Sequence, residues 1–216
     1  AFDVVVLDAI ASEQVQVGSH HLDEPRVVVP SLLEPGDRVP VHLVLAEAVE
    51  REDVGNIRER FAEIIVGTGS GVSGLALFGG MQPDGVLTSV DIEPEHQQAA
   101  REAFLAVGIP TQRFRLIAGP ALSVLPRLSD GAYDMVFVDA DKVEYAEYVE
   151  QGLRLLRHGG VLAVDNALWH NRTADGSHID KETEAIRNAL SAVKENEDLV
   201  TSLLPVGDGL LVAVKR

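Results

Sequence analysis

The stretch Val136-Phe137-Val138-Asp139-Ala140-Asp141-Lys142 decides the fold, because an apolar run of strand length ends abruptly in acidic and basic residues. A second stretch, Gly160-Val161-Leu162-Ala163-Val164-Asp165-Asn166, ends in an acid and an amide in the same way. Neighbouring strands of a parallel sheet release their side chains along one edge. We therefore expect Asp139, Asp165 and Asn166 to converge there, although they are distant in the sequence.

Short apolar runs alternate with helix-like stretches from Glu63 onward. The runs that read as strands are Glu63–Val66, Val86–Val90, Phe114–Ala118, Tyr133–Val138 and Gly160–Val164. The stretches that read as helices are Val72–Met81, Pro94–Val107, Ala121–Leu128 and Val143–Leu156. Strands that alternate with such helices are typical of βαβ units, so the pattern predicts an α/β domain on a mostly parallel sheet.

The pattern changes after Asn166. A polar loop leads into an expected helix at Asp180–Asn196, which two expected strands follow at Leu199–Leu204 and Gly209–Val214. The connection between these two strands is too short for a crossover between parallel neighbours. One of them is therefore expected to run antiparallel at the edge of the sheet.

The first 62 residues do not follow this alternation. Val4–Leu7 and Val27–Val29 have strand propensity, and Leu43–Arg51 has helix propensity. Prolines recur every five residues from Pro25 to Pro40, which argues against long helices in that region.

Composition excludes several classes of function. The chain has 216 residues and a formal net charge of −16, which opposes binding to the phosphate backbone of nucleic acids. It has no cysteine, which excludes disulfides, thiolate metal sites and cysteine nucleophiles. No apolar run is long enough to span a membrane, and no basic-then-apolar leader opens the chain. We therefore expect a cytoplasmic protein that binds a small neutral or cationic molecule, with no nucleic-acid or membrane partner.

A glycine-rich loop, Gly67-Thr68-Gly69-Ser70-Gly71, stands between an expected strand and an expected helix. Glycines let the backbone turn sharply and let a ligand approach, and free N–H groups at the helix start bind polar groups. A tight turn without a ligand is the alternative. The spacing departs from G-x-G-x-x-G, and no Gly-Lys-Ser/Thr follows, which excludes a P-loop nucleotide hydrolase.

Asp91 ends the second expected strand, where a carboxylate suits the two hydroxyls of a ribose. A helix-capping acid before Pro94 is the alternative. Together with the glycine loop, however, Asp91 favours ribose binding and hence an adenosine-bearing cofactor. Gly119 and Ala121, after the third strand, leave room for a flat ring such as adenine.

The set Asp139, Asp165 and Asn166 offers only oxygen ligands, which suits Mg²⁺, Mn²⁺ or Ca²⁺. Either acid alone reads as a cap of a helix or loop, whereas two edge acids with an amide favour a cation. Lys142 stands at an expected helix start, where the helix dipole and a cation favour a neutral amine that can act as a general base. A surface lysine paired to Asp141 or Glu144 is the alternative.

Two roles near these residues follow from their position. Asp141 reads first as a helix N-cap and second as a neighbour of the metal. Trp169 and His170 follow the candidate ligands directly, so they read either as walls of a substrate pocket or, for the tryptophan, as a residue buried under the loop.

Together these residues resemble the metal-dependent, S-adenosylmethionine-using O-methyltransferases of the catechol and caffeoyl-CoA type, in their bacterial small-molecule branch. The resemblance covers about Ile64 to the C-terminus. Its most specific parts are Phe137–Lys142 and Val164–Asn166. The supporting matches are Val66–Gly71, Val90–Pro94 and Leu203–Gly209.

The resemblance implies a Rossmann-like class I methyltransferase fold, with a seven-stranded sheet, helices on both faces and a last strand inserted antiparallel. It implies that Asp139, Asp165 and Asn166 hold Mg²⁺ and that Lys142 deprotonates a hydroxyl of a small phenolic or catechol-like acceptor. It also implies a homodimer. Contacts to S-adenosylmethionine are implied at Val66, Gly67, Thr68, Gly69, Ser73, Asp91, Ile92, Gly119, Ala121 and Asp139.

The chain departs from the family pattern at two places. The family usually has a glutamate where Ile65 stands, and here Glu63 lies two residues earlier. Residues 1–62 do not resemble the helical segment that normally covers the active site. We expect one compact domain overall, in which 63–216 form the methyltransferase domain and 1–62 a lid or dimer-contact segment.

Two other classes of function stay open at this point. A nicotinamide-dependent oxidoreductase on a Rossmann sheet would use the glycine loop and Asp91 but leave Asp139, Asp165 and Asn166 without purpose. A non-catalytic member of the family would bind the cofactor and act as a regulatory or structural partner.

Overall fold

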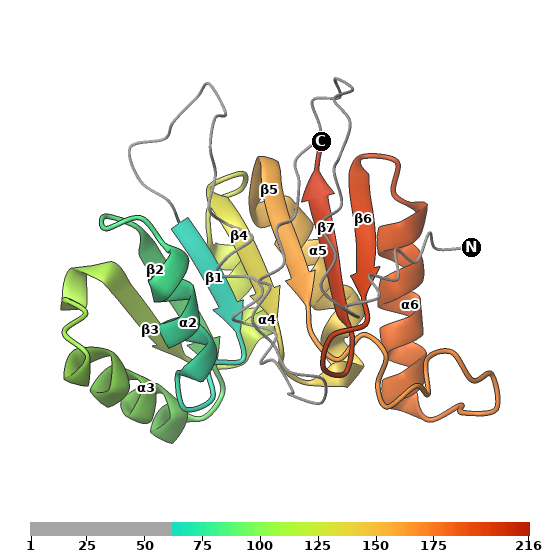
Figure 1. The fold of residues 1–216 in the computed structure, drawn as a ribbon, viewed down its shortest axis with the longest axis horizontal. Helices are drawn as coiled ribbons and strands as arrows, with labels where there is room; N and C mark the ends of the chain where they lie inside the picture. Colours follow the sequence, from blue (N-terminus) through green and yellow to red (C-terminus); the bar gives the residue numbers. More distant parts are fainter. Residues whose placement is uncertain (1–61) are drawn as a thin grey trace, which may run out of the picture.

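A seven-stranded sheet with the order β3-β2-β1-β4-β5-β7-β6 forms the centre of the molecule in a computed structural model that describes residues 62–216 (Figure 1). The elements expected at Val4–Leu7, Val27–Val29 and Leu43–Arg51 lie outside the described residues. In the part that is described, no helix is both long enough and apolar enough to cross a membrane.

Five strands of the sheet are parallel, as the alternating pattern predicted. They are β1 (Ala62–Val66), β2 (Val86–Asp91), β3 (Phe114–Ala118), β4 (Tyr133–Val138) and β5 (Leu156–Val164). Val66 pairs with Val90 on one side and with Val138 on the other, and Val138 pairs with Val164. The C-terminal ends of four strands therefore lie in one row, at the lower edge of the sheet in Figure 1.

The C-terminal part adds an antiparallel strand to this sheet. Helix α6 (Lys181–Glu195) is followed by β6 (Leu199–Leu204) and β7 (Leu210–Lys215), and β7 pairs antiparallel with both β5 and β6. The antiparallel strand is thus the last one, and it is inserted one place inside the edge, which β6 occupies. The arrow of β7 accordingly points opposite to its neighbours in Figure 1.

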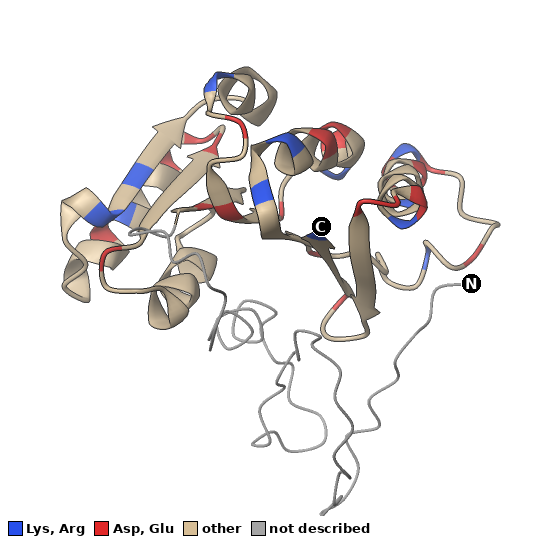
Figure 2. Cartoon of the chain, turned by 90° about the horizontal axis from the view of Figure 1, so that it is seen from above, with Lys and Arg blue, Asp and Glu red and all other residues tan. Residues whose placement is uncertain are grey.

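Helices cover both faces of the sheet (Figure 2). On one face α2 (Val72–Gly80) and α3 (Pro94–Ala106) pack against side chains such as Ile65 and Phe137. On the other face α4 (Ala121–Val124), α5 (Tyr145–Leu155) and α6 pack against Ile64, Val136 and their neighbours. Consecutive residues of one strand enter opposite cores because side chains alternate along a strand.

Two of the expected helices are shorter than the sequence predicted. The helix expected at Ala121–Leu128 is one α-turn followed by a 3₁₀ turn, Leu125–Arg127, because Pro126 has no N–H to continue the α-helical bonding. The helix expected at Val143–Leu156 begins as a 3₁₀ turn at Lys142–Glu144 and ends at Leu155, since Leu156 already belongs to β5.

A buried acid lies near the start of β1, at the opposite end of that strand from the glycine loop. Glu63 is 1% exposed, and its Oε2 has no hydrogen-bond partner within residues 62–216. Burial raises the pKa of Glu63 to about 8, with a further increase from the charge of Asp134 and a decrease from Arg113. The carboxyl group is therefore predominantly protonated at neutral pH.

Glu63 is expected to make the stability of the fold depend on pH. Its pKa in the folded chain lies above the unfolded value of 4.5, so its contribution to stability is present below pH 4.5 and is lost as the pH rises through about 8. Glu63→Gln should therefore raise the free energy of unfolding by on the order of 1 kcal/mol at alkaline pH and by much less under acidic conditions. Urea denaturation at the two pH values measures the difference.

The control is Asp84→Asn, which removes one charge from an exposed turn. An equal pH-dependent gain in both variants would show that net charge, and not the buried carboxyl group, causes the effect.

Candidate active site

Backbone hydrogen bonds extend the sheet by one residue beyond the strand ends. The N–H of Gly67 donates to the carbonyl of Val90 at 2.9 Å, and the N–H of Asp139 donates to the carbonyl of Val66 at 2.9 Å. The N–H of Asp165 donates to the carbonyl of Val138 at 3.0 Å. These bonds place the glycine loop, Asp139 and Asp165 side by side, as the strand-end pattern predicted.

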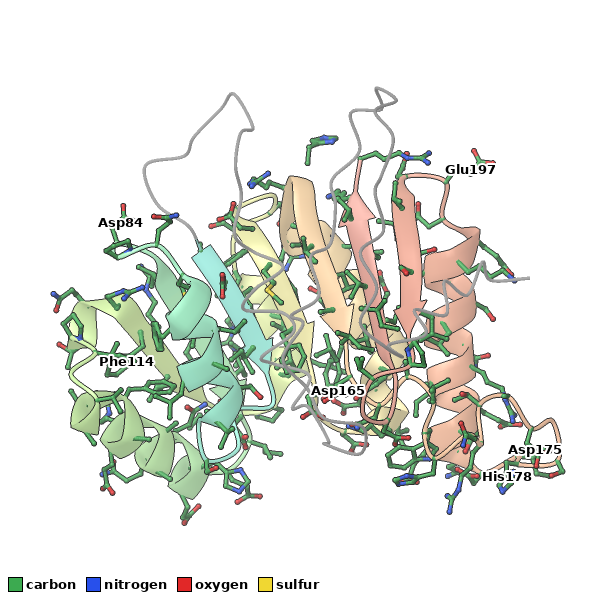
Figure 3. The ribbon with its side chains drawn as sticks, viewed as in Figure 1. Asp84, Phe114, Asp165, Asp175, His178 and Glu197 are labelled. Atoms are coloured by element: carbon green, nitrogen blue, oxygen red, sulfur yellow. The ribbon has the colours of Figure 1, made fainter. Side chains whose placement is uncertain are left out.

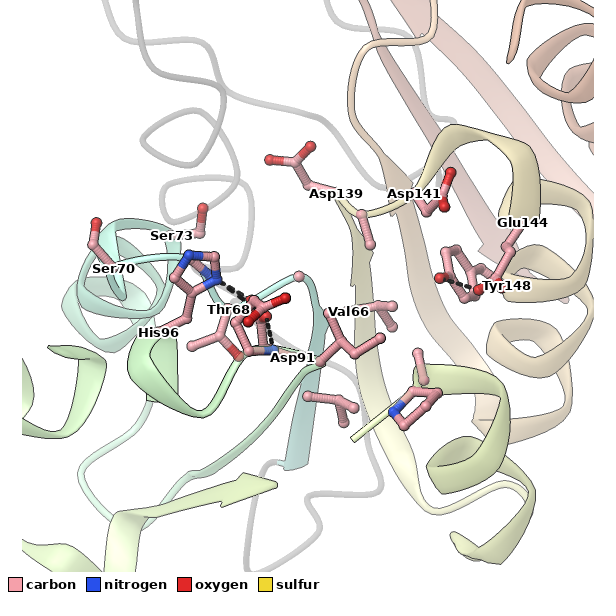
Figure 4. A pocket seen from close by; sticks show the side chains of 18 of the residues that line it. Val66, Thr68, Ser70, Ser73, Asp91, His96, Asp139, Asp141, Glu144 and Tyr148 are labelled. Atoms are coloured by element: carbon pink, nitrogen blue, oxygen red, sulfur yellow. Dashed lines mark hydrogen bonds and ion pairs between the residues drawn. The ribbon is translucent and has the colours of Figure 1, made fainter. Parts of the chain in front are cut away.

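A cavity of about 480 Å³ opens at this edge of the sheet, between the glycine loop, the end of β2 and the segment after β4 (Figure 4). The predicted cofactor residues that line it are Val66, Gly67, Thr68, Gly69, Ser73, Asp91, Ile92, Ala121 and Asp139. Gly119 does not line the cavity. Its N–H donates to the carbonyl of Asp91 at 2.8 Å, and the next residue, Pro120, takes the place at the wall.

Close approach of the backbone explains the first glycine of the loop. Gly67 has a φ of +99°, and a Cβ there would lie 1.9 Å from the carbonyl oxygen of Asp139. Only glycine allows the ends of β1 and β4 to lie so close together. Gly69, with a φ of +50°, has no atom within 4 Å of such a Cβ, so its backbone faces open space.

Asp91 is held rigidly at the cavity wall. Its Oδ2 accepts a hydrogen bond from the N–H of Gly69 at 2.9 Å, and its Oδ1 accepts one from the N–H of Glu93 at 2.9 Å. His96 Nδ1 lies 3.1 Å from the same Oδ1. Asp91 thus binds the chain just before α3 but is not its N-cap, which is Glu93, and its side chain faces the cavity (Figure 4).

Thr68 contributes to the loop from the inside. Its side chain is buried, and its hydroxyl lies 2.6 Å from that of Ser89 and accepts a hydrogen bond from Gln97 Nε2 at 3.0 Å. Gln97 also donates to the carbonyls of Ser89 and Ile117. This buried network ties the glycine loop to α3 and β3, so the backbone of the loop is preformed for a ligand.

Lys142 lies beside Asp139. Its Nζ donates to Asp139 Oδ1 at 3.1 Å and to the carbonyl of Ala140 at 3.0 Å, and its side chain is only 13% exposed. The Nζ is 4.9 Å from the ring centre of Tyr145 and 5.9 Å from that of Trp169. The reading of Lys142 as a surface lysine paired to Asp141 or Glu144 is therefore wrong.

Asp141 is the N-cap that the sequence predicted. Its Oδ1 accepts a hydrogen bond from the N–H of Val143 at 3.0 Å, at the start of the 3₁₀ turn. The turn points the chain back toward α5 and leaves Lys142 on the side of Asp139.

Asp165 and Asn166 complete the edge of the sheet. Burial raises the pKa of Asp165 to about 6; the N–H of Asn166 and the charge of Lys142 lower it, and the charges of Asp139 and Asp208 raise it. Asn166 has a φ of 56°, a left-handed conformation that asparagine tolerates better than most residues.

The donor set of this edge fits a hard cation. Two carboxylates, Asp139 and Asp165, repel each other in a partly buried place, and a divalent cation would relieve that repulsion. In residues 62–216 no three acidic or histidine side chains lie close enough together to hold a metal. A cation here would therefore need the amide oxygen of Asn166 as its third protein ligand, and the predicted set of three stays a prediction.

An aromatic wall flanks the same edge. Trp169 and His170 have left-handed φ values of 47° and 55°, and their rings lie 5.5 Å apart with an angle of 27° between their planes. Trp169 is partly buried and packs against the core cluster below it. The reading of this tryptophan as a residue packed under the loop is confirmed, and the reading as a wall of a substrate pocket stays a prediction, which its place near Lys142 supports.

Sequence reasoning missed several residues of the cavity wall. His96 is not among the residues predicted for the site, yet it lines the cavity and contacts Asp91. Tyr148 is also absent from the predicted set, and its hydroxyl donates to Glu144 Oε2 at 2.5 Å in another part of the wall. The available signal was position, because His96 lies in the first turn of the helix that follows Asp91.

Comparisons with known proteins agree with this architecture. A family model described as O-methyltransferase matches residues 57–216. A protein of Mycobacterium tuberculosis whose name assigns it to the O-methyltransferases is 51% identical over 150 residues, which are 69% of this chain and 67% of that protein.

Two solved structures are similar over most of the chain. A Corynebacterium glutamicum protein has a TM-score of 0.74 and 29% identity, with 81% of this chain and 80% of that chain covered. The O-methyltransferase TomG of Streptomyces achromogenes, which is involved in tomaymycin synthesis and was solved with S-adenosylmethionine, has a TM-score of 0.70 and 25% identity. That match covers 89% of this chain and 83% of TomG.

The contact between the glycine loop and β4 predicts different costs for two alanine substitutions. Gly67→Ala forces its Cβ into the backbone of Asp139 and should lower the free energy of unfolding by about 3 kcal/mol. The Cβ of Gly69→Ala meets no neighbouring atom, so this variant should lower the free energy of unfolding by only about 1 kcal/mol, because of its left-handed φ. Chemical denaturation of both variants measures these losses, and equal losses would contradict the proposed close approach.

Proposed function

This chain belongs to the O-methyltransferase family, and on that premise we propose that it methylates a hydroxyl group of a small catechol-like acceptor with a divalent cation and Lys142 as base. It is an S-adenosylmethionine-dependent O-methyltransferase that acts on a small molecule. The nicotinamide-dependent oxidoreductase considered from the sequence is wrong, and the family match also favours an enzyme over a non-catalytic binding protein.

One observation supports the division of the site into a cofactor half and an acceptor half. Asp139 lines the cavity, and the same carboxylate accepts the hydrogen bond of Lys142 at 3.1 Å. A cofactor in the cavity therefore reaches the residue that would hold both the cation and the base. This contiguity is what methyl transfer needs, because the acceptor oxygen must meet the methyl carbon in line.

The cofactor half suits S-adenosylmethionine. Asp91 would accept hydrogen bonds from the ribose hydroxyls, since its Oδ2 keeps a lone pair beyond the bond from Gly69, and its Oδ1 keeps one wherever His96 does not donate to it. The wall formed by Ile92, Pro120 and Ala121 is apolar and suits the adenine ring. The bound cofactor supplies an electrophilic methyl group on a sulfonium. Neither Ile65, which stands at the place of the family glutamate, nor Glu63 lines the cavity.

The acceptor half would hold Mg²⁺, Mn²⁺ or Ca²⁺ on Asp139, Asp165 and Asn166. When bound there, a divalent cation would orient two adjacent acceptor oxygens and make the hydroxyl more acidic. The two carboxylates favour a cation for the reason already given, which is their mutual repulsion in a partly buried place.

Lys142 would take the proton of the acceptor hydroxyl at Nζ. The acceptor oxygen, once deprotonated by Lys142, would be able to take the methyl group that S-adenosylmethionine would supply, with S-adenosylhomocysteine as the leaving group. Asp139 would stabilise the resulting ammonium, because its carboxylate already lies 3.1 Å from the Nζ. The partly buried position beside Tyr145 and Trp169 keeps bulk water away from this proton transfer.

A homodimer also belongs to this proposal, on the strength of the family resemblance alone. Size-exclusion chromatography with light scattering measures the oligomeric state directly.

Removal of the cation tests the acceptor half. EDTA should abolish methylation across a panel of catechols, and excess Mg²⁺ should restore it, because the acceptor would lose its orientation. Asp165→Asn should lower the affinity for Mg²⁺, while Asp175→Asn, an exposed acid of the following loop, should leave it unchanged. Full turnover in the presence of the chelator would refute the metal site.

Two substitutions test Lys142 as the base. Lys142→Ala should lower kcat by about 100-fold or more, with the affinity for S-adenosylhomocysteine nearly unchanged. Lys142→Arg keeps the positive charge beside Asp139 but does not accept a proton, so it should lose as much. Lys181→Ala, at the exposed start of α6, is the control. Wild-type kcat in the arginine variant would show that Lys142 contributes only charge.

A further inference from the structure

The segment 166–180 connects β5 to α6 and carries the aromatic wall, yet it contains no helix or strand. Trp169, His170 and Asn171 have consecutive left-handed φ values of 47°, 55° and 63°. None of them is glycine, so this conformation is intrinsically unfavourable and persists only where surrounding contacts impose it. The contacts that impose it come from two other elements.

The first of these is the turn between β6 and β7. The N–H of Leu168 donates to the carbonyl of Asp208 at 2.8 Å, and the N–H of His170 donates to Asp208 Oδ1 at 2.6 Å. A Cβ on Gly209 would lie 2.5 Å from Leu168 Cγ, which shows how closely the two segments approach. This turn holds the beginning of the loop.

The second is a single arginine of α6. Arg187 Nε donates to the carbonyl of Thr173 at 3.0 Å, and its Nη1 donates to that of His178 at 2.6 Å. Its Nη2 donates to the carbonyls of Arg172 at 2.7 Å and Asp175 at 2.5 Å. All three nitrogens of one half-buried guanidinium thus bind backbone carbonyls of the loop, whose outer end carries Asp175 and His178 (Figure 3).

Hydrogen bonds lead from these carbonyls to the aromatic wall. The N–H of Arg172 donates to the carbonyl of Trp169 at 3.0 Å, and the hydroxyl of Thr173 donates to the carbonyl of Leu168 at 3.0 Å. Arg172 and Thr173, whose carbonyls accept hydrogen bonds from Arg187, therefore donate to the carbonyls of Trp169 and Leu168. That indole lies 5.9 Å from Lys142 Nζ.

We propose that Arg187 is a positioning residue that sets the place of Trp169 beside Lys142 and so determines which flat aromatic acceptors fit. It touches neither cofactor nor acceptor and acts through the loop. The fixed fork of a guanidinium is suited to this task, because it directs its donors at several carbonyls in one plane. The inference rests on the proposed function in one respect, namely that the acceptor lies between Lys142 and Trp169.

The chain offers a matched control in Arg154 on α5. Its Nη2 donates to the carbonyl of Leu125 at 2.8 Å, and its Nη1 donates to that of Leu128 at 3.1 Å. It therefore binds backbone carbonyls as Arg187 does, with additional bonds to the side chains of Asp130 and Gln151. The segment that it holds precedes β4 and so lies near the start of that strand, whereas the site lies at the strand ends. Loss of Arg154 should affect stability without moving Trp169.

The experiment compares Arg187→Gln, Arg187→Lys and Arg154→Gln in the full chain. Trp169 is the only tryptophan, so intrinsic fluorescence reports the position of the loop. Arg187→Gln should shift the emission and raise KM for a catechol acceptor about tenfold or more, because small displacements of a positioned reactant have large kinetic effects. The affinity for S-adenosylhomocysteine, measured by calorimetry, should stay within about twofold, since Arg187 lies outside the cofactor cavity.

Arg187→Lys should fall between wild type and Arg187→Gln, because an ammonium has three donors and no planar fork. Arg154→Gln should lower the melting temperature and leave both emission and acceptor KM as in the wild type. If Arg187→Gln does not fold, the comparison of Arg187→Lys with Arg154→Gln still decides whether Arg187 positions Trp169.

Unchanged emission and unchanged acceptor KM in folded Arg187 variants would overturn the proposal. Equal changes in the Arg187 and Arg154 variants would also overturn it, in favour of a general loss of stability. If the wild-type enzyme methylates no catechol, the proposed function fails. The emission of the Arg187 variants still decides whether this residue positions Trp169.

Discussion

The active-site edge depends on the hydrogen bonds that continue the parallel sheet one residue past its strands. Gly67 bonds to Val90, Asp139 to Val66, and Asp165 to Val138, at 2.9 to 3.0 Å. A shift of one residue in any of these pairs would turn the side chain after the strand to the opposite face of the sheet. The carboxylates of Asp139 and Asp165 face a shared region because the register of three strands agrees.

Asp139 connects the register of the sheet to the side chains of the candidate active site. Its backbone continues β4, its carbonyl approaches Gly67 so closely that no Cβ fits between them, and its carboxylate holds Lys142. In the proposed function, the cavity for the cofactor and the acceptor half would therefore meet at this one residue. Beyond this residue the site is held by contacts from other elements, Asp208 from the β6–β7 turn and Arg187 from α6.

The strands and helices were predictable where interactions between residues close in the sequence determine them. The apolar runs became buried strands because their alternate residues enter two cores, as Ile64 and Ile65 do. Asp141 was predictable as an N-cap, since capping is local. The helix at Ala121 was overestimated because Pro126 interrupts it, and Gly119 was placed in the cavity although Pro120 occupies that position. Tyr148 was missed because nothing in its local sequence distinguishes a wall residue from a core residue, whereas for His96 only its place in the first turn after Asp91 gave a signal.

The sequence by itself determined the alternation of strands and helices, the glycine loop, and the kinds of side chain that follow each strand. These depend on residues a few places apart, whose interactions are the same in any α/β protein. Only the tertiary structure decided that β7 enters between β5 and β6, that Lys142 pairs with Asp139, and that Arg187 binds the loop beside Trp169. Each of these depends on packing and strand order, which bring together side chains and carbonyls whose direction the local sequence does not encode.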